Sequence, residues 1–582
     1  MCGIIGYIGK RNPKEVLLEG LKKLEYRGYD SAGIAFQNEK EIQIIKSVGK
    51  ISNLEEKVNQ ANIIECHTGI AHTRWATHGE PNEINAHPHT VGKITIVHNG
   101  IIENADELKE KLQKEGVSFQ TTTDTEVMAA LINYYYHNDM KEAITKAIKE
   151  VKGSYALGII CHDTPNILYA IRCESPLILG VGENEFFITS DIGAILKYTN
   201  KYVLLGENEL VTLTKEKYQI EKDNKLVERE ILTSDITAEE NSLNGYDHYM
   251  MKEIMEEPTL VNHLAEKYLN HLELLPNLKE YNTIHIVGCG SAYYAGMIGK
   301  NIYEEDNIKV EVEVASEYRY RNIQYSDKTL VILISHSGET ADTIAAMRKA
   351  NNNQIDTLAI VNVDNSTIAR ESTYKVLIEA GQEIAVATTK AFILQVLVLS
   401  LLSYRINPEE SYKKDLKMIP QHLRILLDKS GFYKKMPDAI YKQEDVFFIG
   451  RRIDYAISLE GSLKLKEVSY IHSEAYQAGE LKHGTISLIN DGTVVFGIVT
   501  DEITKDKTLS NLEEVISRGA YPIYIGTDEC KYEHKIIVPK VHKKLQPLLV
   551  VPALQMIAYY VALKRGCSID KPKNLAKSVT VE

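Results

Sequence analysis

The chain has 582 residues, of which 44% are hydrophobic and 25% charged, a balance typical of a soluble globular protein and not of a disordered one. Its length predicts three or four globular units. Because 80 acidic residues outnumber 67 lysines and arginines, the net charge is -13, and the chain as a whole repels nucleic acid and anionic lipid. We therefore predict no nucleic-acid or membrane partner, and we expect any phosphate to be bound in a local pocket.

The cysteines and the apolar segments indicate the compartment. The 7 cysteines form no CxxC pair and are odd in number, which disfavours a disulfide framework and a thiolate zinc site and favours a reducing cytoplasm. The most apolar stretch, 548–563, is interrupted by Pro552 and Gln555 and is shorter than the ~20 apolar residues that span a bilayer. We expect it to be a buried helix. We expect no secretory leader, because Cys2 directly follows Met1.

The segment 2–235 is predicted to form the first domain. Short strand-like runs occur at 3–8, 94–97 and 154–160, with helical periodicity between them, for example at 126–136. This alternation indicates stacked sheets flanked by helices.

A different pattern, repeated twice, follows a polar linker at 236–246. Continuous apolar strands alternate with long helices, which is typical of a parallel sheet covered on both faces. The expected strands lie at 283–287, 330–334 and 357–363 in the first copy and at 446–449, 493–499 and 522–525 in the second. We predict two doubly wound subdomains at 247–420 and 421–567, joined by helices near 395–435.

The chain closes on a polar tail, 568–582, that is too charged to be a core element. Chain termini normally fray. If this tail is ordered, a functional reason is needed.

Cys2 is a candidate nucleophile. Removal of Met1 would leave Cys2 with a free α-amine of pKa near ~8 beside a thiol of pKa near ~8.5, so the amine can serve as the general base. Taken alone, Cys2 could equally be a small buried hydrophobe in a first strand.

Further motifs accompany Cys2. They are MCGIIGYIG (1–9), LEYRGYDSAGIA (24–35), HTRWATHG (72–79), NAHPH (85–89), HNGIIEN (98–104) and TDTEV (123–127). Together they resemble the class II glutamine amidotransferases, whose fold is an αββα sandwich with an N-terminal nucleophile. The resemblance implies glutamine as a substrate, with Cys2 as nucleophile.

A free amino-acid amide carries an α-carboxylate and an α-ammonium, which opposite charges must clamp. Arg74 suits the carboxylate and Asp124 the ammonium. Asn99 and the backbone N–H of Gly100 match the family's oxyanion hole. By resemblance, the glutamine pocket also includes Arg27, Thr77, His78 and His87, and the loop with Trp75 closes over glutamine and gates ammonia passage.

The histidines of this region offer an alternative reading as metal ligands. They are His67, His72, His78, His87, His89 and His98. No two have i, i+4 spacing within a clear helix, and no acidic pattern accompanies them. We therefore predict no metal and no cofactor.

Two turns in the second half predict a phosphate site. The turn 335–340 (SHSGET) follows an expected strand and opens a helix, so hydroxyls and helix N–H groups can bind a phosphate without net positive charge. The turn 288–291 (GCGS) lies at the corresponding strand end of the same sheet, where open α/β folds bind ligands. The equivalent turn in the second copy, 500–502 (TDE), carries carboxylates that repel phosphate. Only one sugar site per chain is expected.

These turns and four further motifs resemble the paired sugar isomerase (SIS) domains. The further motifs are EIAVATTKAF (383–392), EGSLKLKE (460–467), GELKHG (479–484) and NLAKSVTVE (574–582). Taken whole, the chain resembles the isomerising glutamine:fructose-6-phosphate aminotransferase family. The resemblance implies a homodimer that binds glutamine and fructose 6-phosphate, catalyses the first step of hexosamine synthesis and channels ammonia between its two sites.

The same resemblance assigns the sugar site. Lys577 matches the lysine that forms a Schiff base with the open-chain ketose, Glu467 the acid/base that moves a proton between C1 and C2, and His483 the ring-opening residue. Lys464 lies one helical turn before Glu467, and without the resemblance these two would be read as a solvated ion pair. The implied sugar-phosphate residues are Gly290, Ser291, Ser335, His336, Ser337, Thr340, Val386 and Thr388.

Three positions depart from the family pattern: Ala292 replaces Ser, His336 replaces Gln, and Lys573 replaces Arg, which puts sugar affinity and discrimination in doubt. Two rival functions stay open. One is a related enzyme that uses another ketose phosphate or acts in reverse as a deglycase. The other is a non-catalytic sugar-phosphate sensor, which the intact Cys2 and Lys577 disfavour.

Overall fold

The computed structural model describes residues 2–75, 79–234 and 242–579. The chain divides into two compact units, Met1–Ser242 with Ser578–Glu582, and Leu243–Lys577. Thr77 and His78, both predicted to bind glutamine, lie outside the described residues.

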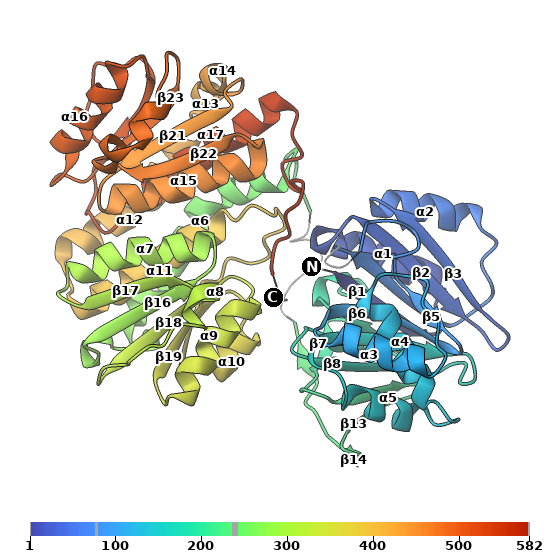
Figure 1. Cartoon of the computed structure of the whole chain (residues 1–582). Coiled ribbons are helices and arrows are strands. Elements are labelled where there is room, and N and C mark those ends of the chain that lie inside the picture. Colours follow the sequence, from blue (N-terminus) through green and yellow to red (C-terminus); the bar gives the residue numbers. More distant parts are fainter. Residues whose placement is uncertain (1, 76–78, 235–241, 580–582) are drawn as a thin grey trace. The chain divides into compact units, whose positions relative to one another are not determined.

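The first unit contains two antiparallel sheets (Figure 1). The eight-stranded sheet has the order β15 (Leu232–Thr233), β11 (Lys201–Leu204), β9 (Ile178–Val181), β10 (Glu185–Thr189), β1 (Gly3–Gly9), β4 (Thr68–Arg74), β2 (Ser31–Gln37) and β3 (Ile42–Val48). The seven-stranded sheet has the order β14 (Lys225–Leu226), β13 (Tyr218–Lys222), β12 (Leu210–Leu213), β8 (Leu168–Cys173), β7 (Gly153–Cys161), β6 (Ile94–Ile102) and β5 (His89–Val91).

Helices cover the outer face of each sheet. Helices α1 (Pro13–Leu24) and α2 (Ile51–Gln60) pack on the eight-stranded sheet. Helices α3 (Ala105–Lys114), α4 (Asp124–Tyr135) and α5 (Met140–Ile148) pack on the seven-stranded sheet.

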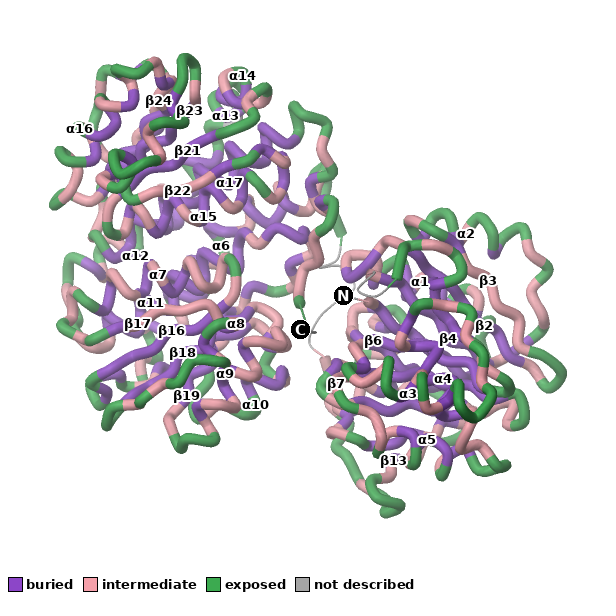
Figure 2. The backbone as a smooth tube through the Cα atoms, in the orientation of Figure 1, coloured by how far each residue is buried: buried purple, intermediate pink, exposed green. Residues whose placement is uncertain are grey.

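The period-2 alternation of β1 shows how the layers form. Ile4 and Ile8 lie in the apolar cluster between the sheets, whereas Ile5 and Tyr7 lie in the cluster under the helices. Both clusters are buried (Figure 2). The predicted αββα sandwich is confirmed.

The second unit contains two parallel five-stranded sheets with the same strand order. The first is β17 (Lys309–Val314), β16 (Thr283–Gly288), β18 (Thr329–Ser335), β19 (Asp356–Val361) and β20 (Tyr374–Leu377). The second is β22 (His472–Gln477), β21 (Asp445–Gly450), β23 (Val494–Val499), β24 (Tyr521–Gly526) and β25 (Lys535–Ile537). The predicted pair of doubly wound subdomains is confirmed.

The helices of the second unit join the two sheets into one body (Figure 1). They are α6 (Tyr249–Asn270), α7 (Ser291–Glu304), α8 (Ala315–Tyr318), α9 (Ala341–Asn352), α10 (Thr367–Glu371), α11 (Lys390–Ile406), α12 (Glu410–Leu427), α13 (Ser430–Tyr433), α14 (Pro437–Ile440), α15 (Ile453–Ser469), α16 (Lys505–Ile516) and α17 (Pro547–Arg565). One apolar cluster includes side chains of α6, α11, α12, α15 and α17 and of both sheets. The two subdomains therefore share a core.

Helix α17 is long and apolar enough to cross a membrane by length and composition, but 89% of its apolar window is buried inside the protein. Burial of this kind is that of a core helix, as the sequence predicted for 548–563.

The polar tail is held by its own side chains and backbone. Both carboxylate oxygens of Asp570 accept hydrogen bonds from first-turn N–H groups of α6, those of Tyr249 and Met250, each at 2.9 Å. The Asp570 carbonyl accepts the N–H of Val386 at 3.0 Å, and the N–H of Lys573 donates to the Tyr470 hydroxyl at 2.8 Å. The tail thus caps a helix that begins some 320 residues earlier.

We expect Asp570→Ala to destabilise the second unit by about 1 kcal/mol, because two N–H groups at the start of α6 lose their acceptor. Differential scanning calorimetry should show a lower Tm for this unit, and limited proteolysis should cut the tail faster than in the wild type. Replacement of the exposed Glu533 by Ala is the control. An unchanged Tm together with a protease-resistant tail would contradict the capping role.

Candidate active sites

The strand register in the first unit brings the Cys2 thiol beside the backbone of Trp75. Gly3 pairs with Thr73 between β1 and β4, so Cys2 lies at the end of both strands. The N–H of Trp75 donates to the thiol sulfur at 3.3 Å, and the thiol donates to the Trp75 carbonyl at 3.5 Å. Burial raises the pKa of the Cys2 thiol, so the thiol is protonated until a base removes its proton.

Asn99 is oriented toward Cys2 by a buried histidine. Its Nδ2 donates to the Cys2 carbonyl at 2.9 Å, and its Oδ1 lies 3.1 Å from His72 Nε2. The same nitrogen lies 3.0 Å from the His98 carbonyl; because both partners are acceptors, Nε2 carries the hydrogen. Burial lowers the pKa of His72 to about 3, so the ring is neutral and holds the amide with its donor end at Cys2.

Gly100 follows Asn99 in β6 with φ +134, and a Cβ at this position would overlap with the carbonyl oxygen of Ser154. Only glycine fits this close approach of the strands β6 and β7. The two predicted oxyanion-hole residues are therefore adjacent on β6, with Asn99 in direct contact with Cys2.

Opposite charges flank the thiol. The Arg74 guanidinium is buried and donates to the carbonyls of Gly79 and Glu80 at 3.2 and 3.3 Å. Asp124 begins α4, and its carboxylate accepts the N–H of Ile102 at 3.0 Å. Burial lowers the pKa of Arg74, against the nearby negative charges of Asp30 and Asp124. The structure thus brings together the two charges that a free amino acid requires.

The other residues predicted to line the glutamine pocket have different surroundings. His87 is buried behind His72, with the two rings stacked at 4.0 Å, so it supports the site from within the core. Arg27 is also buried and lies 3.7 Å from the Asp191 carboxylate. The Trp75 ring meets the Tyr29 ring edge-on at 5.8 Å. Direct binding of glutamine by Arg27 and His87, and gating by Trp75, stay predictions.

In the second unit, the turn after β18 is ordered by its own hydroxyls. Ser335 Oγ lies 2.9 Å from Thr340 Oγ1 and accepts the N–H of Gly338 at 3.1 Å, while Ser337 Oγ accepts the N–H of Glu339 at 3.2 Å. This turn leads into α9, and phosphate binding by its hydroxyls and N–H groups stays a prediction.

The neighbouring turn after β16 connects the two subdomains. Gly290, with φ +55, directly precedes α7. Ser291 Oγ donates to Glu460 Oε1 at 3.1 Å and accepts from Lys464 Nζ at 3.1 Å. Because β16 and β18 are parallel neighbours, both turns lie at the carboxyl edge of one sheet.

The Lys464–Glu467 pair is not the solvated ion pair of the alternative interpretation. Lys464 is 1% exposed and lies 2.7 Å from Glu467 Oε2 and 3.4 Å from Glu460 Oε1. Burial lowers the pKa of Lys464, but the two carboxylates outweigh burial and raise it above its ordinary value. Burial raises the pKa of Glu460 to about 7. Glu467 lies nearer the surface, at 19% side-chain exposure.

Lys577 is buried against the segment 383–388. Its ammonium forms an ion pair with Glu383 and donates to the Ala385 carbonyl at 2.8 Å and to Thr388 Oγ1 at 3.5 Å. His336 belongs to the same group of side chains, because the charges of Glu383 and Lys577 act on its pKa, which burial lowers to about 4. The predicted residues Lys577, Thr388 and His336 are therefore brought together.

His483 is the predicted residue that stands apart. It ends the short 3-10 helix Glu480–His483 and is exposed. Within the described part of the chain, it makes no hydrogen bond or ion pair with Lys464, Glu467 or Lys577.

The turn 500–502 of the second copy is already occupied by an internal anion. The buried carboxylate of Asp454 accepts the N–H groups of Thr500 and Asp501 at 2.8 and 2.9 Å. These are the donors that a phosphate would use. The turn is therefore filled by Asp454, a cause other than the predicted repulsion by the turn's own carboxylates.

The structure shows the neighbours of two of the three residues that depart from the family pattern, His336 and Lys573. His336 is half-buried near the Glu383–Lys577 pair, whose charges act on its pKa. The Lys573 ammonium lies 4.6 Å from the centre of the Tyr470 ring, a cation–π contact that steadies the tail. Nothing in the structure explains Ala292.

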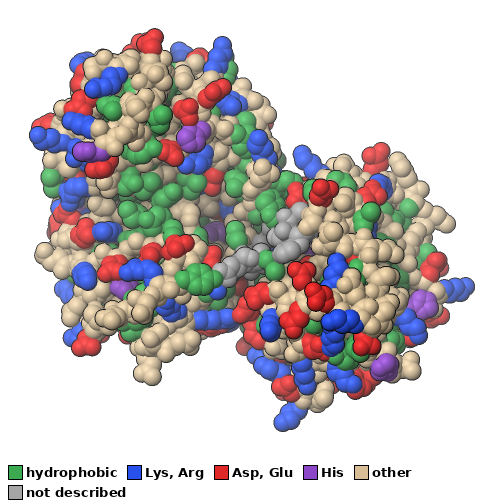
Figure 3. Space-filling view, in the orientation of Figure 1, with side chains coloured by type: hydrophobic (Ala, Val, Ile, Leu, Met, Phe, Trp, Pro, Cys, Tyr) green, Lys and Arg blue, Asp and Glu red, His purple; other side chains and the backbone are tan. Residues whose placement is uncertain are grey.

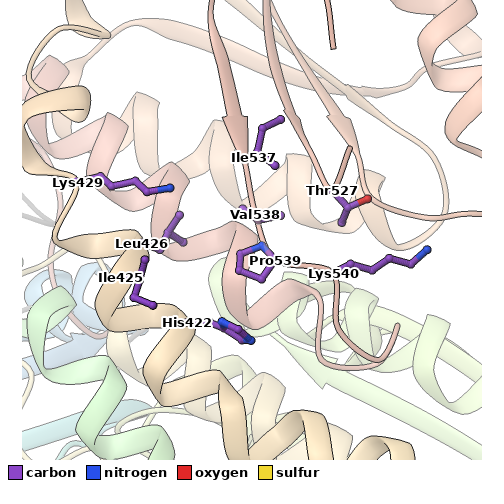
Figure 4. Close-up of a pocket in the computed structure, with 9 residues that line it drawn as sticks. All are labelled: His422, Ile425, Leu426, Lys429, Thr527, Ile537, Val538, Pro539 and Lys540. Atoms are coloured by element: carbon purple, nitrogen blue, oxygen red, sulfur yellow. The ribbon is translucent and has the colours of Figure 1, made fainter. Parts of the chain in front are cut away.

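A cavity of about 270 Å³ lies apart from these residues, between α12 and the segment that follows β25 (Figure 4). Its lining consists of His422, Ile425, Leu426, Lys429, Thr527, Ile537, Val538, Pro539 and Lys540. None of these is a predicted site residue.

Comparison with known proteins gives the class of the chain. The glutamine amidotransferase domain family matches residues 72–197, and the SIS domain family matches residues 277–405 and 439–565. The fold and both sites thus define a glutamine amidotransferase domain joined to a pair of SIS domains.

Full-length relatives are more specific. The chain is 46% identical to the glutamine–fructose-6-phosphate aminotransferase (isomerizing) of Clostridium tetani and 44% identical to that of Caldanaerobacter subterraneus, with 100% of both chains covered in each case. The solved C-terminal domain of the glucosamine-fructose-6-phosphate aminotransferase of Francisella tularensis is 34% identical, with a TM-score of 0.54, and covers 57% of this chain and 100% of that chain. The chain belongs to the isomerising glutamine–fructose-6-phosphate aminotransferase family.

Two functional roles were not predicted from the sequence. His72 orients Asn99, and Glu383 pairs with Lys577. Both residues belong to the motifs HTRWATHG and EIAVATTKAF. Membership of these motifs is the sequence feature that could have indicated their roles.

The buried histidines of the first unit predict a pH dependence of stability. Burial lowers the pKa of His72 to about 3 and holds those of His87 and His89 well below 6.5. Below about pH 6.5 these histidines take up protons in the unfolded chain but not in the folded one. The contribution of the neutral rings to the free energy of unfolding is therefore fully present above about pH 6.5 and is lost as the pH falls toward 3. Each ring contributes at most ~1.4 kcal/mol per pH unit.

We expect calorimetry at pH 5 in buffers of different ionisation enthalpy to show proton uptake when the first unit unfolds. His89→Gln should lower that uptake by about one proton. Replacement of the exposed His162 should not. Unfolding without proton uptake at pH 5 would contradict the assignment of neutral rings.

Proposed function

We propose that the chain converts glutamine and fructose 6-phosphate into glutamate and glucosamine 6-phosphate, the first step of hexosamine synthesis. The observation that carries this proposal is Lys577, a tail amine buried beside the phosphate-site turn of a chain that also bears the Cys2 site. A ketose phosphate needs such an amine for imine chemistry, and the amino group of the product needs the ammonia that the first site releases.

In the proposed first half-reaction, Cys2 attacks the glutamine amide after its proton passes to its own α-amine. Arg74 and Asp124 bind the α-carboxylate and the α-ammonium of the substrate. The Asn99 Nδ2 and Gly100 N–H groups stabilise the oxyanion of the tetrahedral intermediate, and such a donor contributes ~3 kcal/mol. Water then releases glutamate from the thioester.

In the proposed second half-reaction, the turns at 288–291 and 335–340 bind the phosphate with Ser291, Ser335, Ser337 and Thr340. Lys577 forms an imine with the C2 carbonyl of the open sugar, and ammonia replaces it. Glu467 carries the proton from C1 to C2, and Lys464 supports its charge. We also propose domains at 2–235, 247–420 and 421–567, with a linker at 236–246 and a tail at 568–582.

We further propose a dry passage for ammonia with Trp75 as its gate, because ammonium has a pKa near ~9 and only the free base attacks a carbonyl. A cytoplasmic location suits seven cysteines that are all free thiols.

A homodimer would complete the sugar site. His483 is exposed and the following Leu488 is 54% exposed, so this loop is available to a neighbouring chain. Hydrophobic side chains gather across the middle of the shown face of the second unit, around the positions of α7 and α15 (Figure 3). An exposed hydrophobic patch of this kind favours association with a second copy of the chain.

The central test is a product assay with glutamine and fructose 6-phosphate. We expect glucosamine 6-phosphate from the wild type and none from Cys2→Ala with glutamine, whereas Cys2→Ala should still isomerise fructose 6-phosphate. Another ketose phosphate as the preferred substrate would favour the related enzyme, and sugar-phosphate binding without turnover would favour the sensor.

Subunit mixing tests the shared site. His483→Ala and Lys577→Ala chains should each be inactive, and their mixed dimer should regain one of its two sites, giving about a quarter of wild-type activity after random mixing. Activity that stays absent in a verified mixed dimer would show that His483 does not act across the interface.

A further inference from the structure

Three buried carboxylic side chains surround the segment 383–388, which binds Lys577. Glu253 and Glu257 come from α6, and Glu383 comes from the segment itself; their residue exposures are 2%, 0% and 5%. Only Glu383 contacts the Lys577 ammonium among the three. Geometry therefore singles out one carboxylate as the partner of the amine.

The other two carry little negative charge. Burial and the neighbouring Glu383 raise the pKa of Glu253 to about 8, and burial raises that of Glu257 well above its ordinary value. Glu253 instead fixes the loop, since its Oε1 accepts the N–H groups of Ile384 and Ala385 at 2.5 and 3.1 Å. At neutral pH, the negative charge of this cluster is on Glu383.

Glu383 is also rigidly held. Its Oε1 accepts the N–H groups of Thr389 and Ala391 at 3.0 and 3.1 Å at the start of α11, while its Oε2 faces Lys577. Burial would raise the pKa of Glu383, but the Lys577 ammonium and the helix N–H groups outweigh burial and lower it to about 2. One oxygen is thus a structural cap, and the other faces the amine. The pKa of Glu383 is low because Lys577 is charged, and burial raises it once the amine has lost its proton, so the carboxylate can take that proton.

We propose that Glu383 is a catalytic acid/base that exchanges protons with Lys577 and with the sugar oxygen during imine formation. This inference rests on the proposed function of Lys577. It assigns to a residue beside the amine a role distinct from that of Glu467, which acts at C1 and C2.

The step balances without another reactant. Glu383 takes one proton from the ammonium, and the free amine forms a bond to C2 of the ketose as the carbonyl electrons move to oxygen. Glu383 returns that proton to the oxygen, accepts a second proton from the new nitrogen and passes it to the hydroxyl, which leaves as water. An ammonium and a ketone become an iminium and water, and Glu383 ends as a carboxylate beside the iminium charge.

The test is the rate at which borohydride traps fructose 6-phosphate on the full-length enzyme, read as the mass of the Lys577 peptide. Glu383→Gln keeps an Oε1 that can cap α11 but cannot take a proton. We expect about 100-fold slower trapping with an unchanged calorimetric Kd for fructose 6-phosphate. Glu257→Gln, the same change in a buried neighbour without contact to Lys577, should trap at the wild-type rate.

A second variant covers the case in which Glu383→Gln does not fold. Glu383→Ala leaves space for a small carboxylate, so formate should restore trapping and chloride should not. This rescue separates proton transfer from a merely structural role.

The outcomes are distinct. No adduct on wild-type Lys577 would overturn the Schiff-base function and this inference with it. A wild-type adduct with undiminished trapping in Glu383→Gln would overturn the inference alone. In the third outcome, Glu383→Gln binds the sugar more weakly, this loss fully accounts for the slower trapping, and proteases cut the tail. Glu383 would then only hold the tail in place, and the inference would be overturned.

Discussion

The ammonium of Lys577 can lie in the interior only because the Glu383 carboxylate meets it there. An isolated buried charge costs several kcal/mol, whereas a paired and hydrogen-bonded one is tolerated. The pair ties together three distant parts of the fold: the end of the tail, the segment 383–388 and the start of α11. Asp570 strengthens the same arrangement by capping α6 from within the tail. A chain terminus that would otherwise fray is thus held against the core of the second unit.

The first site meets a similar constraint without a buried ion pair at its nucleophile. The pKa of the half-buried Cys2 thiol is raised by loss of solvent, and the neighbouring His72 is neutral. The amide of Asn99 is then fixed by acceptor and donor geometry, so the predicted oxyanion donor has a defined orientation without substrate. Among the described residues, Arg74 and Asp124 carry the opposite charges that a zwitterionic substrate would neutralise.

Much of the fold follows from local sequence patterns. The apolar strands 283–287 and 446–449 indicated sheets directly, and Pro552 and Gln555 distinguished α17 from a membrane span. In 2–235, the alternation of strand-like runs with helical periodicity indicated stacked sheets flanked by helices, and the resemblance supplied the αββα order of the layers. Strand β1 alone gives no clear alternation, because both of its faces are buried.

The sites were predictable only as far as their motifs reach. Lys577 and Glu467 match family motifs, but the partner of Lys577 is 194 residues away, and no local pattern encodes such a contact. His72 is one of several histidines in this region, and its contact with Asn99 depends on the packing of the two sheets against each other. The exposed position of His483, at the end of the short 3-10 helix Glu480–His483, has no sequence signal either.

The central claim, that the buried tail amine becomes covalently joined to the sugar, can be measured directly. Enzyme labelled with [ε-15N]lysine and given [2-13C]fructose 6-phosphate without glutamine should show a carbon resonance in the imine range, with a one-bond coupling to nitrogen that Lys577→Arg abolishes. A bound C2 that stays a ketone or a hemiketal, with no coupling to nitrogen, would contradict the account.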